Sequence, residues 1–351
     1  MLEQAKNVFK DNSINITTSG KRHLGAAIGS KDYKNIYIDE KVSEWCRNIT
    51  KLSNIANSQP HAAYAAFIHG EQHKYTYFLR TIGEIDTNLK PLDDVINNKF
   101  IPSLFGREIS ENERDIIALP VKQGGIGIRK VSERTNIAYE ASKKITTPLV
   151  DEIIKQSNTL PEKGKVIQTK TTTIKAIKLE EAKQAEELKM KQTTEMQRTL
   201  EQNSQPGASS WLSALPLQDH NFNLNKGEFH DSLCLRYNTK PKNLPTRCPC
   251  GSPFDVTHAL NCHKGGFVNA RHDNIKNLEA KMLQTVCNDV EVEPQLQPVT
   301  SGNYQRSANT SDEARPDIRA RGFLASWSNF KTPFSTQELL MLIATVNETP
   351  T

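Results

Sequence analysis

The stretch CPCGSPFDVTHALNC, residues 248–262, carries three cysteines and one histidine: Cys248, Cys250, His258 and Cys262. The whole chain has only 6 cysteines, so the cluster is not a product of a cysteine-rich composition. Three thiols and one imidazole this close together are the ligand set of a small structural zinc site. We therefore predict that these four side chains bind Zn²⁺, and that the ion holds a loop against the start of a helix.

The spacing of this cluster leaves two alternatives open. The Cys-x-Cys opening is tighter than the usual Cys-x-x-Cys, and the adjacent His263 could replace one of the ligands. Without metal, the stretch would be a turn that carries reduced thiols. Four protein ligands leave no open coordination position, so we predict a structural site and not a catalytic one.

Composition sets limits on the class of protein. A chain of 351 residues is long enough for two domains at about 100–200 residues each. The hydrophobic content of 36% and the mean hydropathy of −0.59 are low for a single compact globule, so we expect part of the chain to be solvated. Lys and Arg number 45 against 40 Asp and Glu, a balance that is compatible with a nucleic-acid partner but does not specify one.

The remaining cysteines, Cys46, Cys234 and Cys287, are scattered among apolar neighbours, which fits a reducing compartment. The first residues have no apolar signal core, and no apolar run approaches the roughly 18 residues that a membrane span needs. We predict an intracellular protein, in the nucleus or the cytoplasm, with no membrane partner.

The N-terminal half is predicted to be mainly α-helical. Residues 14–29 alternate β-branched and polar residues and then carry three glycines, which is typical of a short hairpin, so residues 1–30 form a first segment. Apolar residues then recur at helical spacing through residues 31–161. The predicted helices cover 32–56, 62–82, 89–104 and 131–144, and the capping box Ser110-Glu-Asn-Glu113 starts another.

Residues 162–207 differ in composition, because Lys, Glu, Gln and Thr dominate and aromatic residues are absent. Strong helix formers predict a solvated helical linker, and no heptad repeat is sustained long enough for a coiled coil. The alternative is a helix that binds a partner.

Residues 208–351 are predicted to form a second domain of α/β type. Helical patterns cover 229–237 and 271–286, a strand pattern covers 290–293, and Pro316-Asp317 is a turn that leads into another strand. A carboxylate at such a strand start can hold Mg²⁺ and activate water if a second acid and a lysine join it. The following sequence does not supply them, so we predict that the site at Asp317 is incomplete.

Basic and aromatic residues alternate in residues 61–80, among them His61, Tyr64, Lys74, Tyr75 and Arg80. Such a face could contact a nucleic-acid backbone. Aromatic side chains at helical spacing are more often part of a hydrophobic core, and both interpretations stay open at this point.

Several motifs together resemble the reverse transcriptases of non-LTR retrotransposons. The run 20–29 (GKRHLGAAIG) is similar to the end of the palm, and residues 59–67, 77–81 and 119–128 resemble the thumb region. The knuckle at 248–262, the Arg-His-Asp start at 271–273 and the Arg-Pro-Asp turn at 315–317 follow the order found in the restriction-like endonuclease of such elements.

The resemblance implies thumb-like helices in the first half and a restriction-endonuclease-like α/β domain with a zinc knuckle in the second. It implies RNA or DNA as partner, structural Zn²⁺, and Mg²⁺ only if the nuclease-like site at Asp317 is active. The residues that it implies for contact with nucleic acid are Lys21, Arg22, Lys74, Arg80, Arg271 and His272.

The chain also departs from the family pattern. It contains no Tyr/Phe-x-Asp-Asp motif, so it should not polymerise DNA. We expect a product truncated at both ends, and we interpret the sequence after Phe330 as a frameshift that removed the second nuclease acid. The predicted function is therefore a fragment of a reverse transcriptase–endonuclease, with RNA or DNA binding at most.

Two alternatives remain. The first is an active Mg²⁺-dependent endonuclease that uses Asp317 with a partner acid such as Glu313. The second is a host-adopted zinc-binding module that binds proteins through the helix at residues 162–203.

Overall fold

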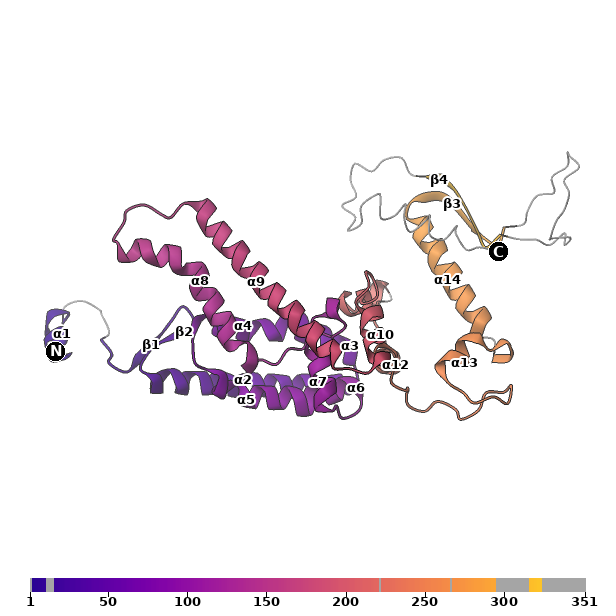
Figure 1. Ribbon diagram of the computed structural model, residues 1–351, viewed down its shortest axis with the longest axis horizontal. Helices are drawn as coiled ribbons and strands as arrows, with labels where there is room; N and C mark the ends of the chain where they lie inside the picture. The colour runs from indigo at the N-terminus through magenta and orange to yellow at the C-terminus, as the bar shows by residue number, and fades with distance from the viewer. Residues whose placement is uncertain (1, 11–15, 221, 266, 295–315, 324–351) are drawn as a thin grey trace, which may run out of the picture. The chain divides into compact units, whose positions relative to one another are not determined.

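The computed structural model describes residues 2–10, 16–220, 222–265, 267–294 and 316–323 (Figure 1). These residues are mostly helical, and their strands form two antiparallel pairs, β1–β2 and β3–β4. The chain divides into two compact units, Met1–Lys242 and Asn243–Thr351. The prediction of a mainly α N-terminal half is confirmed.

The first unit begins with α1 (Leu2–Val8), which was not predicted, and a hairpin of β1 (Gly20–His23) and β2 (Ala26–Gly29). The two strands pair in antiparallel register, with Gly20 opposite Gly29. The hairpin predicted within 14–29 is thus confirmed over residues 20–29, whereas residues 14 and 15 lie outside the described residues. Tyrosines fix the hairpin tip, since Tyr37 Oη donates to Gly25 O at 2.8 Å and Tyr77 Oη donates to Leu24 O at 2.6 Å.

Helices then follow one another at short intervals, as the apolar spacing predicted. Their bounds are α2 (Lys31–Ala56), α3 (Pro60–Ala66), η1 (Phe67–Glu71), α4 (Gln72–Thr81), α5 (Asp86–Val95), η2 (Ile96–Phe100), α6 (Ile101–Phe105), α7 (Glu111–Ala118), η3 (Val121–Gln123), η4 (Ser132–Arg134) and α8 (Thr135–Ile154). The π-helical turns η1 and η2 join their neighbours without a break, so η1 lies within the predicted helix at 62–82 and η2 within the predicted helix at 89–104.

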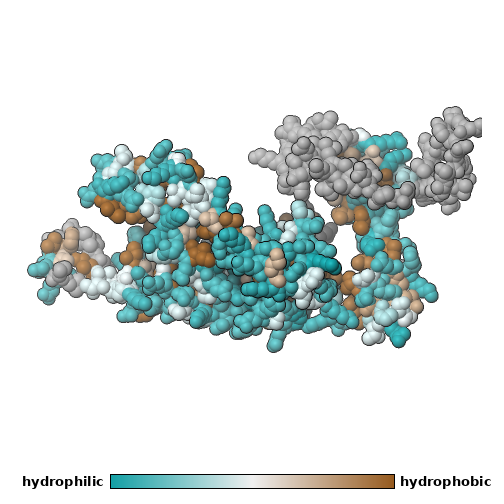
Figure 2. Space-filling view, viewed as in Figure 1, coloured by the Kyte–Doolittle hydropathy of each residue, from teal (hydrophilic) through white to brown (hydrophobic). Residues whose placement is uncertain are grey.

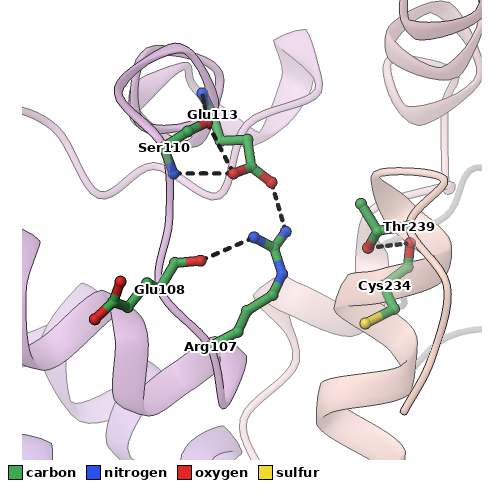
Figure 3. Close-up of polar contacts among 6 residues, drawn as sticks. All are labelled: Arg107, Glu108, Ser110, Glu113, Cys234 and Thr239. Carbon is green, nitrogen blue, oxygen red and sulfur yellow. Dashed lines mark hydrogen bonds and ion pairs between the residues drawn. The ribbon is translucent and has the colours of Figure 1, made fainter.

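The capping box predicted at Ser110 is confirmed and anchors the start of α7 (Figure 3). Ser110 Oγ accepts from Glu113 N at 3.4 Å, and Glu113 Oε2 accepts from Ser110 N at 3.0 Å. Arg107 adds an ion pair to Glu113 at 2.5 Å. Burial acts to raise the pKa of Glu113, but the hydrogen bonds from Arg107 and Ser110 outweigh it and lower that pKa. Just after the helix Lys226–Arg236, Thr239 Oγ1 donates to Cys234 O at 3.3 Å, a contact that is also drawn in Figure 3.

The glycine-rich turn at residues 124–128 lies in the interior of the first unit, where side chains from distant helices bind its carbonyl groups. Tyr64 Oη donates to Ile126 O at 2.8 Å, and Arg114 donates to Ile128 O at 2.7 Å. Arg236 donates to Gly125 O at 2.8 Å. A Cβ at position 125 would lie 2.0 Å from Leu119 O, so only glycine fits there.

The charged segment after α8 is helical, as predicted, but the structure differs from the predicted linker. It forms α9 (Lys163–Met190) and α10 (Thr194–Asn203). Leu200 is buried in the core, and α9 packs along α8. Glu181 pairs with Arg129 at 2.8 Å and with Arg134 at 2.6 Å. A few apolar and charged contacts are enough to hold the segment, although its composition is that of a solvated helix.

Residues 208–242 also belong to the first unit, whereas the predicted second domain began at residue 208. They form α11 (Ser210–Ser213), η5 (Gln218–His220) and α12 (Lys226–Arg236). Phe229 of α12 is fully buried and stacks on His61, with ring centroids 5.4 Å apart. The helical pattern of α12 was visible in the sequence, but its packing partner was not.

The second unit contains α13 (Val256–Asn261), η6 (His263–Gly265), α14 (Phe267–Gln284), β3 (Cys287–Val292) and β4 (Ile318–Phe323). The strands pair in antiparallel register, with Val290 opposite Ala320, and α14 packs on β3. A helix and two strands are thus present where they were predicted. The larger α/β fold, Glu313 and the sequence after Phe330 lie outside the described residues. Among the residues that are described, no helix is long and apolar enough to cross a membrane.

Candidate metal centre

The first two cysteines of the cluster lie on a tight turn. Gly251 has a φ of +93°, a conformation that side chains rarely adopt, and its N–H donates to Cys248 O at 2.8 Å. Cys248 N then donates to Ser252 O at 2.9 Å, which closes the turn. Because of this turn, the chain reverses between the first pair of ligands and the helix that carries the third.

Helix α13 and the residue that follows it supply the other two ligands. Asp255 caps its start and accepts a hydrogen bond from His258 N at 2.6 Å. Cys262 follows the helix, and its N–H donates to His258 O at 2.8 Å. One turn of helix therefore separates His258 from Cys262, and residues four apart on a helix lie on the same face.

The four ligand atoms converge within 4.8 Å of one another. Cys248 Sγ lies 3.5 Å from Cys262 Sγ, and Cys250 Sγ lies 3.2 Å from His258 Nε2. A tetrahedral zinc with bonds of about 2.3 Å to sulfur and 2.0 Å to nitrogen has edges of about 3.5–3.8 Å, close to these separations. All described cysteines are free, and 3.5 Å is far beyond a disulfide bond.

The pKa values of the Cys250 and Cys248 thiols are shifted in opposite directions. Hydrogen bonds from the side chain and the backbone of Ser252 lower the pKa of Cys250 to about 6. For Cys248, the backbone N–H of Cys250 acts in the lowering direction, but burial and the neighbouring thiols outweigh it and raise the pKa. A thiolate is the metal-binding form of cysteine, so the hydrogen bonds from Ser252 favour the form of Cys250 that a metal requires.

Within the described ranges, this is the one group of three or more His, Cys, Asp or Glu side chains with metal-ligand spacing. His263, the alternative ligand, does not belong to it; it lies exposed in η6. The structure therefore brings together the four residues that the sequence predicted. Their arrangement could hold a metal ion.

Asp317 lies next to a second polar cluster in this unit. Its Oδ2 is 3.3 Å from His272 Nε2, and its main-chain O accepts from Glu293 N at 2.9 Å. Lys276, which is buried, donates to Asp273 Oδ1 at 2.9 Å and also contacts Glu293. Sequence reasoning did not single out Lys276 or Glu293; the spacing of Asp273 and Lys276, three residues apart on α14, was the only signal.

The residues implied for nucleic-acid contact fall into two groups. Lys21 and Arg22 are exposed on β1, and Lys74 and Arg80 are exposed on α4. These two elements meet, because Tyr77 of α4 binds the hairpin tip. Arg271 and His272 are exposed near the start of α14, in the other unit.

Most aromatic residues within 61–80 belong to the core, whereas Tyr77 is exposed. His61, Tyr64 and Tyr75 are buried, so they are not available to a nucleic acid. The exposed Lys74 pairs with Glu71 at 2.5 Å, whereas Arg80 makes no ion pair with a carboxylate of the described residues. The core interpretation of the aromatic residues is therefore confirmed.

Comparison with known proteins adds no family assignment. No protein-family model matches the chain, and neither does any curated protein sequence.

Proposed function

We propose that Cys248, Cys250, His258 and Cys262 bind one Zn²⁺ as a closed structural site. The convergence of their four donor atoms carries this proposal. Three sulfurs and one imidazole nitrogen favour zinc over Mg²⁺ or Ca²⁺, which prefer oxygen. The bound ion would join the turn around Gly251 to α13, and its binding energy would contribute to the folding of this part of the chain.

Cobalt substitution tests the ligand set. Tetrahedral Co²⁺ bound by thiolates absorbs visible light, so a titration with Co²⁺ should produce a band that Zn²⁺ then removes. Cys250→Ser should weaken the band, while Cys234→Ser, at a buried cysteine of the first unit, should leave it unchanged. A band that persists in a variant lacking both Cys250 and Cys262 would contradict the site.

We further propose that the chain is of the non-LTR retrotransposon reverse transcriptase–endonuclease type and that it acts by binding RNA or DNA. Support comes from Lys21, Arg22 and Arg80, which are exposed on two adjoining elements. None of the three forms an ion pair with a carboxylate in the described part of the chain. Free cations on neighbouring elements suit a phosphate backbone, which carries regular negative charge.

Binding should therefore depend steeply on salt. We would measure the affinity for a 30-nucleotide RNA and for the matching DNA duplex by fluorescence anisotropy, at several salt concentrations. Replacing Lys21, Arg22 and Arg80 by Ala should lower the salt slope by about two to three. Replacing the exposed Lys51, Lys90 and Lys122 by Ala is the matched control, and an equal loss in both variants would contradict this interface.

The second candidate function is Mg²⁺-dependent cleavage of DNA at Asp317. The observation that favours it is the contact of Asp317 with His272, beside Asp273 and Glu293, which both contact the buried Lys276. Carboxylates beside a lysine can hold Mg²⁺ and activate water, although these acids do not converge in the described residues as the zinc ligands do. Nicking of supercoiled plasmid in the presence of Mg²⁺, lost in Asp317→Asn, would support this function. The absence of nicking by the wild-type protein would rule it out.

A further inference from the structure

Helices α8 and α9 lie side by side and form an arm that extends from the body of the first unit (Figure 1). A groove of about 460 Å³ lies between them. We name it the arm groove. Its lining residues are Ile137, Glu140, Ala141, Lys143, Lys144 and Thr147 of α8, and Thr173, Ala176 and Ile177 of α9.

The helix on one side of the groove is strongly basic. Between residues 163 and 179 it carries five lysines and no acidic residue: Lys163, Lys165, Lys170, Lys175 and Lys178. All five are exposed, and none forms an ion pair with a described carboxylate. Lys170 lies one turn before Thr173, so the two side chains share a face of the helix.

Across the groove, α8 adds further positive charge. Lys143 lies 4.0 Å from Glu140, a long ion pair, whereas Lys144 has no carboxylate partner among the described residues. Lys144 therefore faces the groove with its charge uncompensated.

The floor of the groove contains a hydroxyl group without a partner. Thr173 is 5% exposed, and its Oγ1 makes no hydrogen bond. Nearby threonines do not share this property: Thr169 donates to Lys165 O at 2.9 Å, and Thr172 donates to Gln168 O at 3.0 Å. An unsatisfied buried hydroxyl is costly, which is expected where a ligand completes its hydrogen bond.

We propose that the arm groove binds the phosphodiester backbone of a nucleic acid, with lysines neutralising phosphates and Thr173 donating a hydrogen bond to a phosphate oxygen. This inference rests on the proposed RNA or DNA binding and assigns it a surface between the predicted helix at 131–144 and the segment predicted as a linker. Lys163 to Lys178 span about 22 Å at 1.5 Å per residue, so a polymer matches this length of basic helix better than a single phosphate ion.

A protein partner is less well matched to this surface. Five exposed apolar residues of the arm lie near its end: Leu149, Val150, Ile153, Ile154 and Leu160 (Figure 2). Four more, Ile137, Ile167, Ile174 and Leu179, are spread along α8 and α9 and form no patch of that size. The groove lining combines Lys143, Lys144 and the buried hydroxyl of Thr173, which are groups that bind phosphate, with the apolar Ile137, Ala141, Ala176 and Ile177. We therefore assign the groove to nucleic acid.

Charge reversal tests the proposal in the full-length chain. Lys144→Glu, Lys163→Glu and Lys170→Glu would be combined in one variant, with Lys51→Glu, Lys90→Glu and Lys122→Glu as a control of equal net charge. The probe is a fluorescein-labelled 30-nucleotide RNA. The arm variant should bind about tenfold more weakly than the control at 0.1 M salt, since each lost phosphate contact lowers affinity.

Thr173→Val tests the hydroxyl separately, because valine has nearly the same shape. This variant should melt at a higher temperature than the wild type, since the unsatisfied hydroxyl is gone, yet bind the RNA several-fold more weakly. Unchanged RNA binding by Thr173→Val would overturn the assignment of the groove.

The remaining outcomes separate this inference from the proposed function. If the wild-type protein does not bind RNA or DNA at all, the proposed function fails, and this inference fails with it. If the wild type binds and the arm variant equals the control, the arm groove alone is refuted. If poly-glutamate of equal charge displaces the RNA, the arm groove binds acidic proteins as well as it binds RNA. That result would also overturn the proposal.

Discussion

Replacing Gly125 by Ala should destabilise the first unit more than any other glycine substitution in its glycine-rich turn. The new Cβ would lie 2.0 Å from Leu119 O and 2.8 Å from Ile116 O, both backbone atoms that cannot rotate away. Relief of the clash requires a backbone shift of about 1 Å, because Cβ contacts below about 3 Å essentially do not occur.

That shift breaks hydrogen bonds inside the turn. Gly127 N donates to Leu119 O at 3.0 Å, and Gly125 O accepts from Arg236 at 2.8 Å. Each buried group that loses its partner costs about 1–3 kcal/mol. For these two hydrogen bonds the sum is about 2–6 kcal/mol, a large part of the stability of a typical domain, about 5–15 kcal/mol.

Urea unfolding, followed by the fluorescence of the buried Trp45, measures this cost. Gly70→Ala is the matched control, because a Cβ there meets nothing within 4 Å and Gly70 lies in a helical segment. The control should leave stability unchanged or raise it slightly. A Gly125→Ala variant within about 1 kcal/mol of the wild type would refute the packing described for this turn.

Three further predictions concern other parts of the first unit. Ser110→Ala removes one half of the capping box and should cost about 1 kcal/mol, measured by the same urea unfolding, whereas no change would show that the cap contributes little. Burial lowers the pKa of His61, so the fold favours its neutral form. The contribution of His61 to the free energy of unfolding should therefore be fully present above a pH of about 6.5, and it should decrease as the pH drops below that value. His61→Asn should reduce this dependence, and His73→Asn, at an exposed site, should not. Thr173→Val should raise the unfolding free energy by about 1 kcal/mol, and a loss of stability would contradict the unpartnered hydroxyl.

Local patterns in the sequence predicted local structure well. The capping box at Ser110, the hairpin glycines and the apolar spacing of residues 32–56 each depend on neighbours within a few residues, and each is found in the structure. The metal cluster could be predicted for the same reason, since one turn and one short helix hold all four ligands.

Features that depend on distant contacts could not be predicted in this way. The segment at residues 162–203 looked solvated because its apolar residues are few, yet Leu200 is buried and Glu181 pairs with two arginines. The unpartnered hydroxyl of Thr173 and the burial of Lys276 likewise arise only when another element packs against them. Composition cannot reveal these contacts, because it does not show which helices meet.

The metal content of the purified full-length protein tests the central claim most directly. Native mass spectrometry of the wild type should show one Zn²⁺ per chain, and the ion should be absent after replacement of Cys250 and His258. Cys46→Ser, outside the cluster, should retain it. A wild-type chain that carries no zinc after incubation with the ion, or a double variant that still carries it, would contradict the account.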